Sequence, residues 1–248
     1  MDSISLLGLR VNRLSMEEAL QALERFIRDR APQHVVTADA SMAVIARRDP
    51  ELHAIVQSAN LVTPDGFGIV WASRLLRMPI AHKVSGVDLV AQLCRLSALH
   101  GYRLFFLGAA PGVAALAAEN LCRQYPGAQI VGTRDGYFSA DQEAEIVAQI
   151  KAARPDALLV AFGIPKQEKW INKYKEELAV PVSIGIGGSF DVYSGRVKRA
   201  PMWMQNQGME WLYRLWCNPR KIAKVMTLPK FVVLVWMLVL RQRLWGPL

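Results

Sequence analysis

One carboxylate, Asp65, is placed where it could do chemistry. It lies in the segment Thr63-Pro64-Asp65-Gly66-Phe67-Gly68, where an apolar strand pattern gives way to a helical one. Open α/β sheets bind ligands beyond the carboxyl ends of their strands, and an acid there can accept a proton from a substrate. Asp65 is therefore a candidate general base. The same segment also suits an ordinary turn in which Asp65 caps the next helix, because proline presets φ and glycine accepts positive φ.

The segments around Asp65 alternate between apolar strands and amphipathic helices. Strand patterns cover residues 4–11, 34–37, 61–63, 103–107, 129–132, 157–162 and 182–186. Helical patterns cover residues 15–28, 41–59, 66–76, 87–99, 111–125, 141–153 and 166–178. Ser15 and Glu18 have the spacing of a capping box, and Asp49-Pro50 is expected to interrupt the second helix. This alternation predicts an α/β, Rossmann-like, largely parallel sheet with helices on both faces.

Glycines occur where three of these strands end, at Gly108, Gly163 and Gly187. Without a Cβ atom, backbone amides can approach a phosphate closely, so this edge suits a phosphate-containing ligand. Glycine at a strand-to-helix turn is also common for steric reasons alone. None of the three fits a GxGxxG or Walker A pattern, which makes a dinucleotide-dependent dehydrogenase a remote alternative.

The chain is basic, with 30 Lys and Arg against 21 Asp and Glu and a formal charge of +9 over 248 residues. This charge favours an anionic partner such as nucleic acid, a phosphorylated substrate or an acidic membrane surface. The excess lies in the tail, where Glu210 is the only acidic residue from Arg196 onward. No nucleic-acid-binding motif accompanies it, so a nucleic-acid partner is not expected.

The tail also carries apolar and aromatic residues. Residues 201–217 have a helical pattern, and residues 231–240 are ten consecutive apolar residues. As a helix, ten residues would extend about 15 Å, against a hydrocarbon core of about 30 Å. With basic residues on both sides, the segment is expected to lie in an anionic leaflet rather than to span it. A buried core helix is the alternative. The predicted organisation is a catalytic domain, residues 1–195, and a C-terminal helical membrane-associating appendage, residues 196–248.

The three cysteines, Cys94, Cys122 and Cys217, are odd in number and lack CxxC spacing. They fit a reducing cytoplasm, and the N-terminus has no secretory signal pattern. No cluster of metal-ligand spacing and no Asp-x-Asp motif after a strand is evident. No metal and no cofactor are therefore expected.

Seven short segments occur in order between about residue 35 and residue 220. They are Val36-Thr37-Ala38-Asp39, Thr63-Pro64-Asp65-Gly66, Val84-Ser85-Gly86-Val87-Asp88-Leu89, Phe106-Leu107-Gly108, Gly163-Ile164-Pro165-Lys166-Gln167-Glu168-Lys169-Trp170, Gly187-Gly188-Ser189-Phe190-Asp191, and Arg199-Ala200-Pro201 through Glu210-Trp211-Leu212-Tyr213-Arg214-Leu215. Together they resemble the WecG/TagA/CpsF family of glycosyltransferases. The resemblance implies an inverting enzyme that moves a sugar from a UDP-sugar donor to a polyprenyl-diphosphate-linked saccharide in bacterial surface or exopolysaccharide synthesis.

The resemblance also implies roles for residues near the reacting atoms. Asp65 matches the family's general base, which would deprotonate the acceptor hydroxyl. Thr37 matches an active-site threonine, and Gln167 a residue that contacts donor or acceptor. Asp39 departs from the asparagine of some members, which removes two N–H donors and adds a second candidate base two residues from Thr37.

Substrate-binding residues follow from the same resemblance. For the donor nucleotide they are Gly108, Tyr137, Gly163, Lys166, Gly187, Phe190 and Asp191; for the acceptor diphosphate they are Arg214, Lys221 and Lys224. Simple packing is the alternative for Tyr137, and a solvated or lipid-facing charge run is the alternative for Lys221 and Lys224. Glu168 and Trp170 are expected to cap and pack their helix.

The expected partners are thus the UDP-sugar donor, the polyprenyl-diphosphate acceptor and an anionic membrane surface, at the cytoplasmic face of the inner membrane. A homo-oligomer is left open. The reaction is expected to be independent of metal, with leaving-group charge neutralised by glycine-turn amides and cationic side chains. The alternative from a different class is a non-catalytic nucleotide-binding membrane scaffold of the same fold.

Overall fold

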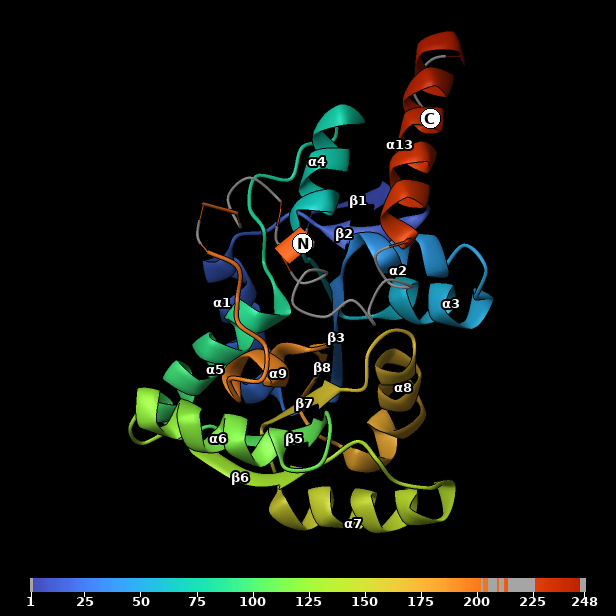
Figure 1. Ribbon diagram of the computed structural model, residues 1–248. Coiled ribbons are helices and arrows are strands. Elements are labelled where there is room, and N and C mark those ends of the chain that lie inside the picture. Colours follow the sequence, from blue (N-terminus) through green and yellow to red (C-terminus); the bar gives the residue numbers. More distant parts are fainter. Residues whose placement is uncertain (1, 202, 205–208, 210–211, 214–225, 246–248) are drawn as a thin grey trace.

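The computed structural model describes residues 2–201, 203–204, 209, 212–213 and 226–245. At its centre is a six-stranded parallel sheet in the order β4-β3-β8-β7-β5-β6 (Figure 1). The strands are β3 (Gln33–Ala38), β4 (Leu61–Pro64), β5 (Arg103–Gly108), β6 (Gln129–Arg134), β7 (Ala157–Ala161) and β8 (Val182–Gly185). The parallel α/β fold expected from the alternating patterns is confirmed.

Apart from the short α9, which was not predicted, the helices of the sheet domain follow the sequence patterns. They are α1 (Met16–Asp29), α2 (Ala40–Ile45), α3 (Pro50–Ser58), α4 (Phe67–Leu75), α5 (Gly86–His100), α6 (Val113–Gln124), α7 (Glu143–Ala153), α8 (Lys166–Leu178), α9 (Ser189–Tyr193) and α13 (Thr227–Trp245). A 3-10 turn, Ala140–Gln142, precedes α7. Ser15 and Glu18 form the expected capping box, and Asp49 caps α3 at the expected interruption.

Side chains alternate between the two faces of the sheet, because successive residues of a strand point in opposite directions. Val35 and Ile184 pack toward α1, α5 and α6, whereas Val36 packs toward α2 and α4. Leu158 and Val160 pack toward α7 and α8. The sheet is therefore covered on both faces, with α1, α5, α6 and α9 on one side and α2, α3 and α8 on the other (Figure 1).

The first expected strand is wrong as a single element. Residues 3–12 form an antiparallel hairpin of β1 (Ser3–Leu6) and β2 (Leu9–Asn12). Leu7 and Gly8 between them have φ of 53° and 85°. Positive φ at both central residues is the signature of a tight hairpin turn. A leucine rarely adopts such a φ. The strand pattern of residues 4–11 did not reveal this turn, which falls at Leu7 and Gly8.

The apolar run of residues 231–240 belongs to the longer helix α13, which stands beside α2 and α4 (Figure 1). Phe231, Val235 and Val239 are buried against α2 and α4, so one face of the helix joins the core. The alternative of a buried core helix therefore holds for this face of α13. Within the described part of the chain, no helix combines the length and the apolar character needed to cross a membrane. Most of the expected helix 201–217 lies outside the described residues.

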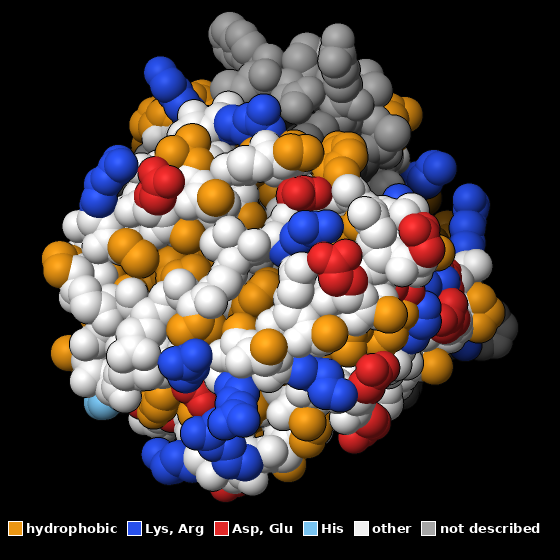
Figure 2. Space-filling view, turned by 90° about the horizontal axis from the view of Figure 1, so that it is seen from below, with side chains coloured by type: hydrophobic (Ala, Val, Ile, Leu, Met, Phe, Trp, Pro, Cys, Tyr) orange, Lys and Arg blue, Asp and Glu red, His pale blue; other side chains and the backbone are white. Residues whose placement is uncertain are grey.

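Charges on the body of the protein are mixed in sign. Figure 2 shows the molecule from below, with Lys and Arg side chains interspersed with Asp and Glu side chains and with small apolar patches. This mixture agrees with the concentration of excess positive charge after Arg196.

Candidate active site

The first candidate residues lie at the ends of two adjacent parallel strands. Thr37 pairs with Thr63 and Ala38 with Pro64, so Asp39 and Asp65 are the next residues along β3 and β4. Neighbouring strands lie about 5 Å apart. The sheet thus brings together two carboxylates separated by 26 positions in the sequence. We call the end of the sheet where these strands finish the carboxyl edge.

Thr37 links this pair to the next strand. Its hydroxyl is buried and donates a 2.7 Å hydrogen bond to the carbonyl oxygen of Gly185, at the end of β8. The helices after β3 and β8 depart toward opposite faces, α2 into one core and α9 into the other. Such a divergence is where open α/β sheets bind ligands. Thr37 therefore lies at the place in the topology where a substrate is expected.

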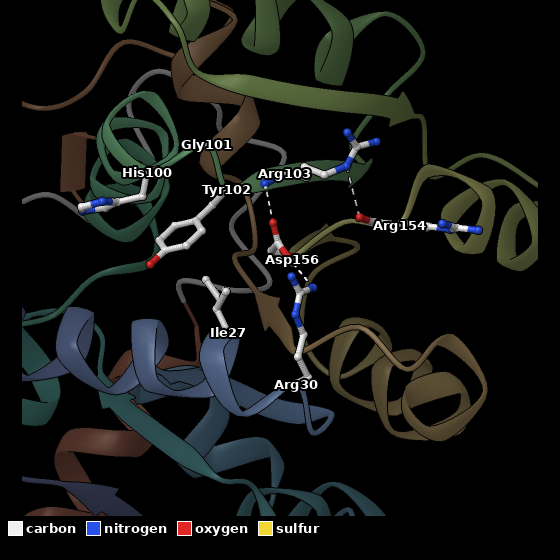
Figure 3. A pocket seen from close by; sticks show the side chains of 8 residues that line it. All are labelled: Ile27, Arg30, His100, Gly101, Tyr102, Arg103, Arg154 and Asp156. Carbon is white, nitrogen blue, oxygen red and sulfur yellow. Dashed lines mark hydrogen bonds and ion pairs between the residues drawn. The ribbon is translucent and has the colours of Figure 1, made fainter.

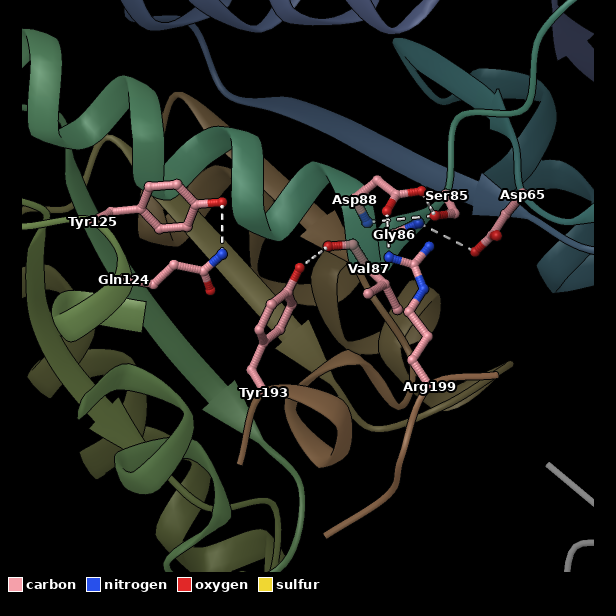
Figure 4. A network of polar contacts seen from close by, with 9 residues as sticks. All are labelled: Asp65, Ser85, Gly86, Val87, Asp88, Gln124, Tyr125, Tyr193 and Arg199. Carbon is pink, nitrogen blue, oxygen red and sulfur yellow. Dashed lines mark hydrogen bonds and ion pairs between the residues drawn. The ribbon is translucent and has the colours of Figure 1, made fainter. Parts of the chain in front are cut away.

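Asp65 is half-buried and is held by its backbone and its side chain. Its N–H donates to the carbonyl oxygen of Ala38 at 2.9 Å, which fixes the chain beyond β4. Its Oδ2 accepts a 3.3 Å hydrogen bond from the N–H of Gly86, the first residue of α5 (Figure 4). A helix N-terminus favours negative charge. This geometry gives a fixed carboxylate at the carboxyl edge, as a base requires.

Asp39 has a structural task in the described contacts. Its Oδ1 accepts hydrogen bonds from the N–H of Met42 at 2.8 Å and from the hydroxyl of Ser41 at 2.5 Å. It is therefore the N-cap of α2. A second-base role for Asp39 stays a prediction.

Gln167 joins the ends of β7 and β8. Its side chain is only 1% exposed. Its Oε1 accepts from the N–H groups of Gly163 at 3.1 Å and Gly187 at 3.0 Å, and its Nε2 donates to Glu168 at 2.7 Å. Gly185 makes room for it, because a Cβ there would lie 2.5 Å from Nε2. In this structure Gln167 shapes the two glycine turns; direct contact with a substrate stays a prediction.

The proposed donor-binding residues differ in accessibility. Lys166 is exposed at the start of α8, and Tyr137 is 75% exposed beyond β6. Phe190, in contrast, is fully buried and stacks on Phe106 with ring centroids 4.6 Å apart, so its ring acts in core packing here. Asp191 is partly exposed in α9.

Gly108 has a packing reason to be glycine. Its φ is 118°, and a Cβ would lie 2.7 Å from the backbone of Ala161. The steric alternative for this glycine is therefore sufficient, and its role toward the donor stays a prediction. The acceptor candidates Arg214, Lys221 and Lys224 lie outside the described residues.

A network of polar contacts that no motif predicted leads away from Asp65. Ser85 caps α5 and donates a 2.6 Å hydrogen bond to Asp88, and Arg199 forms a 2.7 Å ion pair with Asp88 (Figure 4). Burial alone would raise the pKa of Asp88, but the hydrogen bonds from Arg199 and Ser85 lower it below its usual value. The Ser85-to-Asp88 spacing before an apolar run was the available signal for the cap. These contacts connect Arg199, at the start of the tail, to α5, whose first N–H group binds Asp65.

In the part of the chain that the structure describes, no cluster of three or more His, Cys, Asp or Glu could hold a metal ion. Cys94 and Cys122 are free thiols, and burial raises the pKa of Cys94 to about 12. Metal independence stays a prediction.

Comparison with known proteins agrees with the resemblance noted from the motifs. A family model described as "Glycosyl transferase WecG/TagA/CpsF family" matches residues 4–245. A protein of Bacillus spizizenii is 38% identical over 201 residues, covering 81% of this chain and 77% of the relative. One of Bacillus subtilis is 37% identical over 202 residues, covering 81% and 78%. One of Staphylococcus aureus is 28% identical over 231 residues, covering 92% and 90%. All three are named N-acetylglucosaminyldiphosphoundecaprenol N-acetyl-beta-D-mannosaminyltransferase.

Proposed function

Because the chain belongs to the WecG/TagA/CpsF family of glycosyltransferases, we propose that it transfers N-acetylmannosamine from a UDP-sugar to a polyprenyl-diphosphate-linked N-acetylglucosamine. The names of its relatives support the acceptor and the sugar. The observation that carries the proposal is the Asp65 carboxylate, held at the carboxyl edge by the N–H of Gly86.

The reaction is a direct displacement at the anomeric carbon. The acceptor hydroxyl oxygen forms a bond to that carbon, the bond from the carbon to the diphosphate oxygen breaks, and UDP leaves with the bonding electron pair. Asp65 takes the proton of the hydroxyl. Attack on the face opposite UDP inverts the configuration, so an α-linked donor gives a β-linked product.

The other residues bind and orient in this proposal. Thr37 pairs with Thr63, two residues before Asp65, and in this proposal it orients the donor or acceptor from the end of β3. Gln167 accepts from the N–H groups of Gly163 and Gly187 and so fixes the two turns at the edge that would receive the diphosphate. Lys166 and the cationic residues of the tail would offset the charge of the departing UDP.

The site of action follows from the acceptor, whose prenyl chain is confined to a membrane. The protein would act as a peripheral enzyme at the cytoplasmic face, with α13 and the basic tail at the bilayer surface. Basic residues beside an exposed apolar helix face suit an anionic leaflet. Removing residues 229–248 should then shift the protein from the membrane to the soluble fraction; because this also removes Phe231, Val235 and Val239 from the core, thermal unfolding is measured alongside to show that the truncated protein is folded.

The test is a donor panel with a defined acceptor. Purified protein is incubated with a short-chain prenyl-diphosphate N-acetylglucosamine and, separately, the UDP derivatives of N-acetylmannosamine, N-acetylglucosamine, glucose and glucuronic acid. We expect a β-linked disaccharide lipid and equimolar UDP with the first donor, also in the presence of EDTA. Binding of UDP without transfer from any donor would favour the non-catalytic scaffold instead. Loss of turnover in EDTA with recovery in Mg²⁺ would overturn metal independence.

A further inference from the structure

A groove lies between the end of α2 and the start of α13, at the opposite end of α2 from Asp39. It has a volume of about 590 Å³. Its walls are apolar, from Val44 on one side and Pro229, Val233 and Leu234 on the other. Three cations also line it: Arg47, Arg48 and Lys230. An apolar slot with cations beside it is suited to a molecule that is both apolar and anionic.

The three cations are exposed and face no described acidic partner. Among the residues that the structure describes, none of Arg47, Arg48 and Lys230 forms an ion pair. The acids that follow them in sequence, Asp49 and Glu51, both pair with Lys169 of α8, at 2.8 Å and 2.7 Å. The groove therefore keeps its positive charge.

The groove continues into an exposed apolar face of α13. Residues at a helical spacing of four form the buried face of this helix, as described above. Its other face exposes six large apolar side chains: Val232, Val233, Trp236, Met237, Leu240 and Leu244. Val233 belongs to both the groove and this face. The charge and the apolar surface are thus continuous across α2 and α13.

We propose that this groove binds the headgroup and upper acyl chain of an anionic membrane phospholipid. Arg47 and Arg48 would contact the phosphate, for which guanidinium groups are suited by their paired N–H donors. Val44, Val233 and Leu234 would contact the chain, and the exposed face of α13 would enter the same leaflet. The membrane-binding surface then includes the catalytic domain as well as the tail.

This site deepens the proposed function, on which it rests for the presence of a membrane-bound acceptor. Helix α2 begins at the Asp39 cap beside Asp65 and ends next to Arg47. Its six residues extend roughly 9 Å. A phospholipid at the far end of α2 would hold the headgroup layer close to the carboxyl edge. A prenyl-linked diphosphate in that layer could then reach the carboxyl edge.

The test measures binding of the full-length protein to vesicles of phosphatidylcholine, with and without added phosphatidylglycerol. We expect the double variant Arg47→Gln/Arg48→Gln to bind the anionic vesicles about 30-fold more weakly, from about 1 kcal/mol per basic residue near the surface. Binding to neutral vesicles should change little. The control Arg95→Gln/Lys151→Gln removes the same charge from exposed positions on α5 and α7 and should keep nearly wild-type binding.

A second variant tests the apolar wall of the groove. Val233→Asp places a carboxylate between the cations and the acyl chain, and it should weaken binding to both kinds of vesicle.

The proposal would be overturned if Arg47→Gln/Arg48→Gln and its control lost binding equally. It would also be overturned if Arg47→Gln/Arg48→Gln lost no binding. Arg47→Gln/Arg48→Gln should transfer sugar normally to a water-soluble acceptor. Failure of this transfer would assign Arg47 and Arg48 to the acceptor diphosphate and would also overturn the lipid proposal. If the wild type binds vesicles selectively but transfers nothing, the lipid site stands and the proposed function fails.

Discussion

Charged residues lie both at the carboxyl edge of the sheet and at its amino edge, where the strands begin. They differ in which helix ends they meet: helix N-termini at the carboxyl edge and helix C-termini at the amino edge. At the carboxyl edge, helices α2, α4, α6, α8 and α9 begin just after strands, and carboxylates such as Asp39 and Asp65 accept from N–H groups of helix N-termini. At the amino edge, α1, α5 and α7 end, and a pocket of about 650 Å³ is lined by Arg30, Arg103 and Arg154 (Figure 3).

Two of the three amino-edge arginines, Arg30 and Arg103, are engaged with the fold. Arg103 donates to the carbonyl oxygens of Ala153 and Arg154 at the end of α7, at 2.9 Å and 3.3 Å. Arg30 pairs at 2.7 Å with Asp156, which also accepts from the N–H of Arg103 at 2.8 Å. Helix C-termini carry partial negative charge and attract cations. Pocket volume and positive charge therefore do not indicate an anion site here, whereas the polarity of the carboxyl edge suits a diphosphate.

The sharpest test of this contrast is Asp65→Asn. The amide keeps the size of the side chain but cannot accept the acceptor proton at neutral pH. We expect sugar transfer to fall by about 10² to 10⁴-fold with a thermal midpoint close to the wild type. Steady-state kinetics and thermal unfolding measure the two quantities. Transfer within tenfold of the wild type would remove Asp65 from the role of base.

Gln167→Ala tests the buried link between β7 and β8. It leaves the N–H groups of Gly163 and Gly187 without the side-chain oxygen that accepts from both. We expect a loss of about 2–4 kcal/mol in the free energy of unfolding, since unsatisfied buried donors are costly. Transfer should also fall, because the turns lose their anchor.

Gln149→Ala is the matched control for Gln167. Gln149 makes the same kind of amide-to-carboxylate hydrogen bond, to Glu145 at 2.8 Å, but on the exposed surface of α7. Its replacement should cost within about 0.5 kcal/mol. Similar losses in urea unfolding of the two variants would show that burial of Gln167 adds nothing to its effect.

At the amino end of β3, His34→Leu tests a buried neutral side chain. Burial lowers the pKa of His34 to about 3, with a smaller contribution from Lys175. In the unfolded chain His34 has a pKa near 6.5, so it gains a proton as the pH falls from about 7 toward 3, whereas in the folded protein it stays neutral over this range. Stability from neutral His34 is complete above about pH 6.5 and decreases as pH falls.

The expected size of this effect at pH 5 is about 2 kcal/mol relative to pH 7. Urea unfolding at several pH values should show that loss in the wild type and a flatter dependence in His34→Leu. The exposed-site variant His82→Gln should keep the wild-type dependence. Parallel curves for the wild type and His34→Leu would contradict the assignment.

Local signals predicted much of this fold. The expected bounds of α8 match the observed helix, and the capping box at Ser15 and the interruption at Asp49 are where the sequence indicated. These features depend on residues a few positions apart. The hairpin turn at Leu7 and Gly8 was missed because a lone glycine inside a strand pattern is a weak signal and a leucine with positive φ has none.

Features set by distant residues could not be predicted. The Asp88 to Arg199 ion pair joins positions 111 residues apart, and the docking of α13 on α2 depends on which helix completes the core. That Asp39, Asp65 and the glycine turns meet at one edge could be predicted, because parallel strands gather their ends there; their roles in a site stay predictions. The burial of Gln167 and Phe190 was not foreseen, because a motif specifies neighbours in sequence but not depth in the fold.

Asp156→Asn provides the smallest expected effect and the closest counterpart to Asp65→Asn. The same substitution at the amino edge weakens the pair with Arg30, whose side chain is 68% exposed and can be solvated, while the amide oxygen can still accept from the N–H of Arg103. We expect a loss of about 1–2 kcal/mol in the free energy of unfolding and transfer within twofold of the wild type. Measured side by side, the two variants should separate catalysis from stability. If Asp156→Asn abolished transfer in a folded protein, the amino-edge pocket would have to be counted as part of the functional site, because the charges there would then do more than hold helix ends.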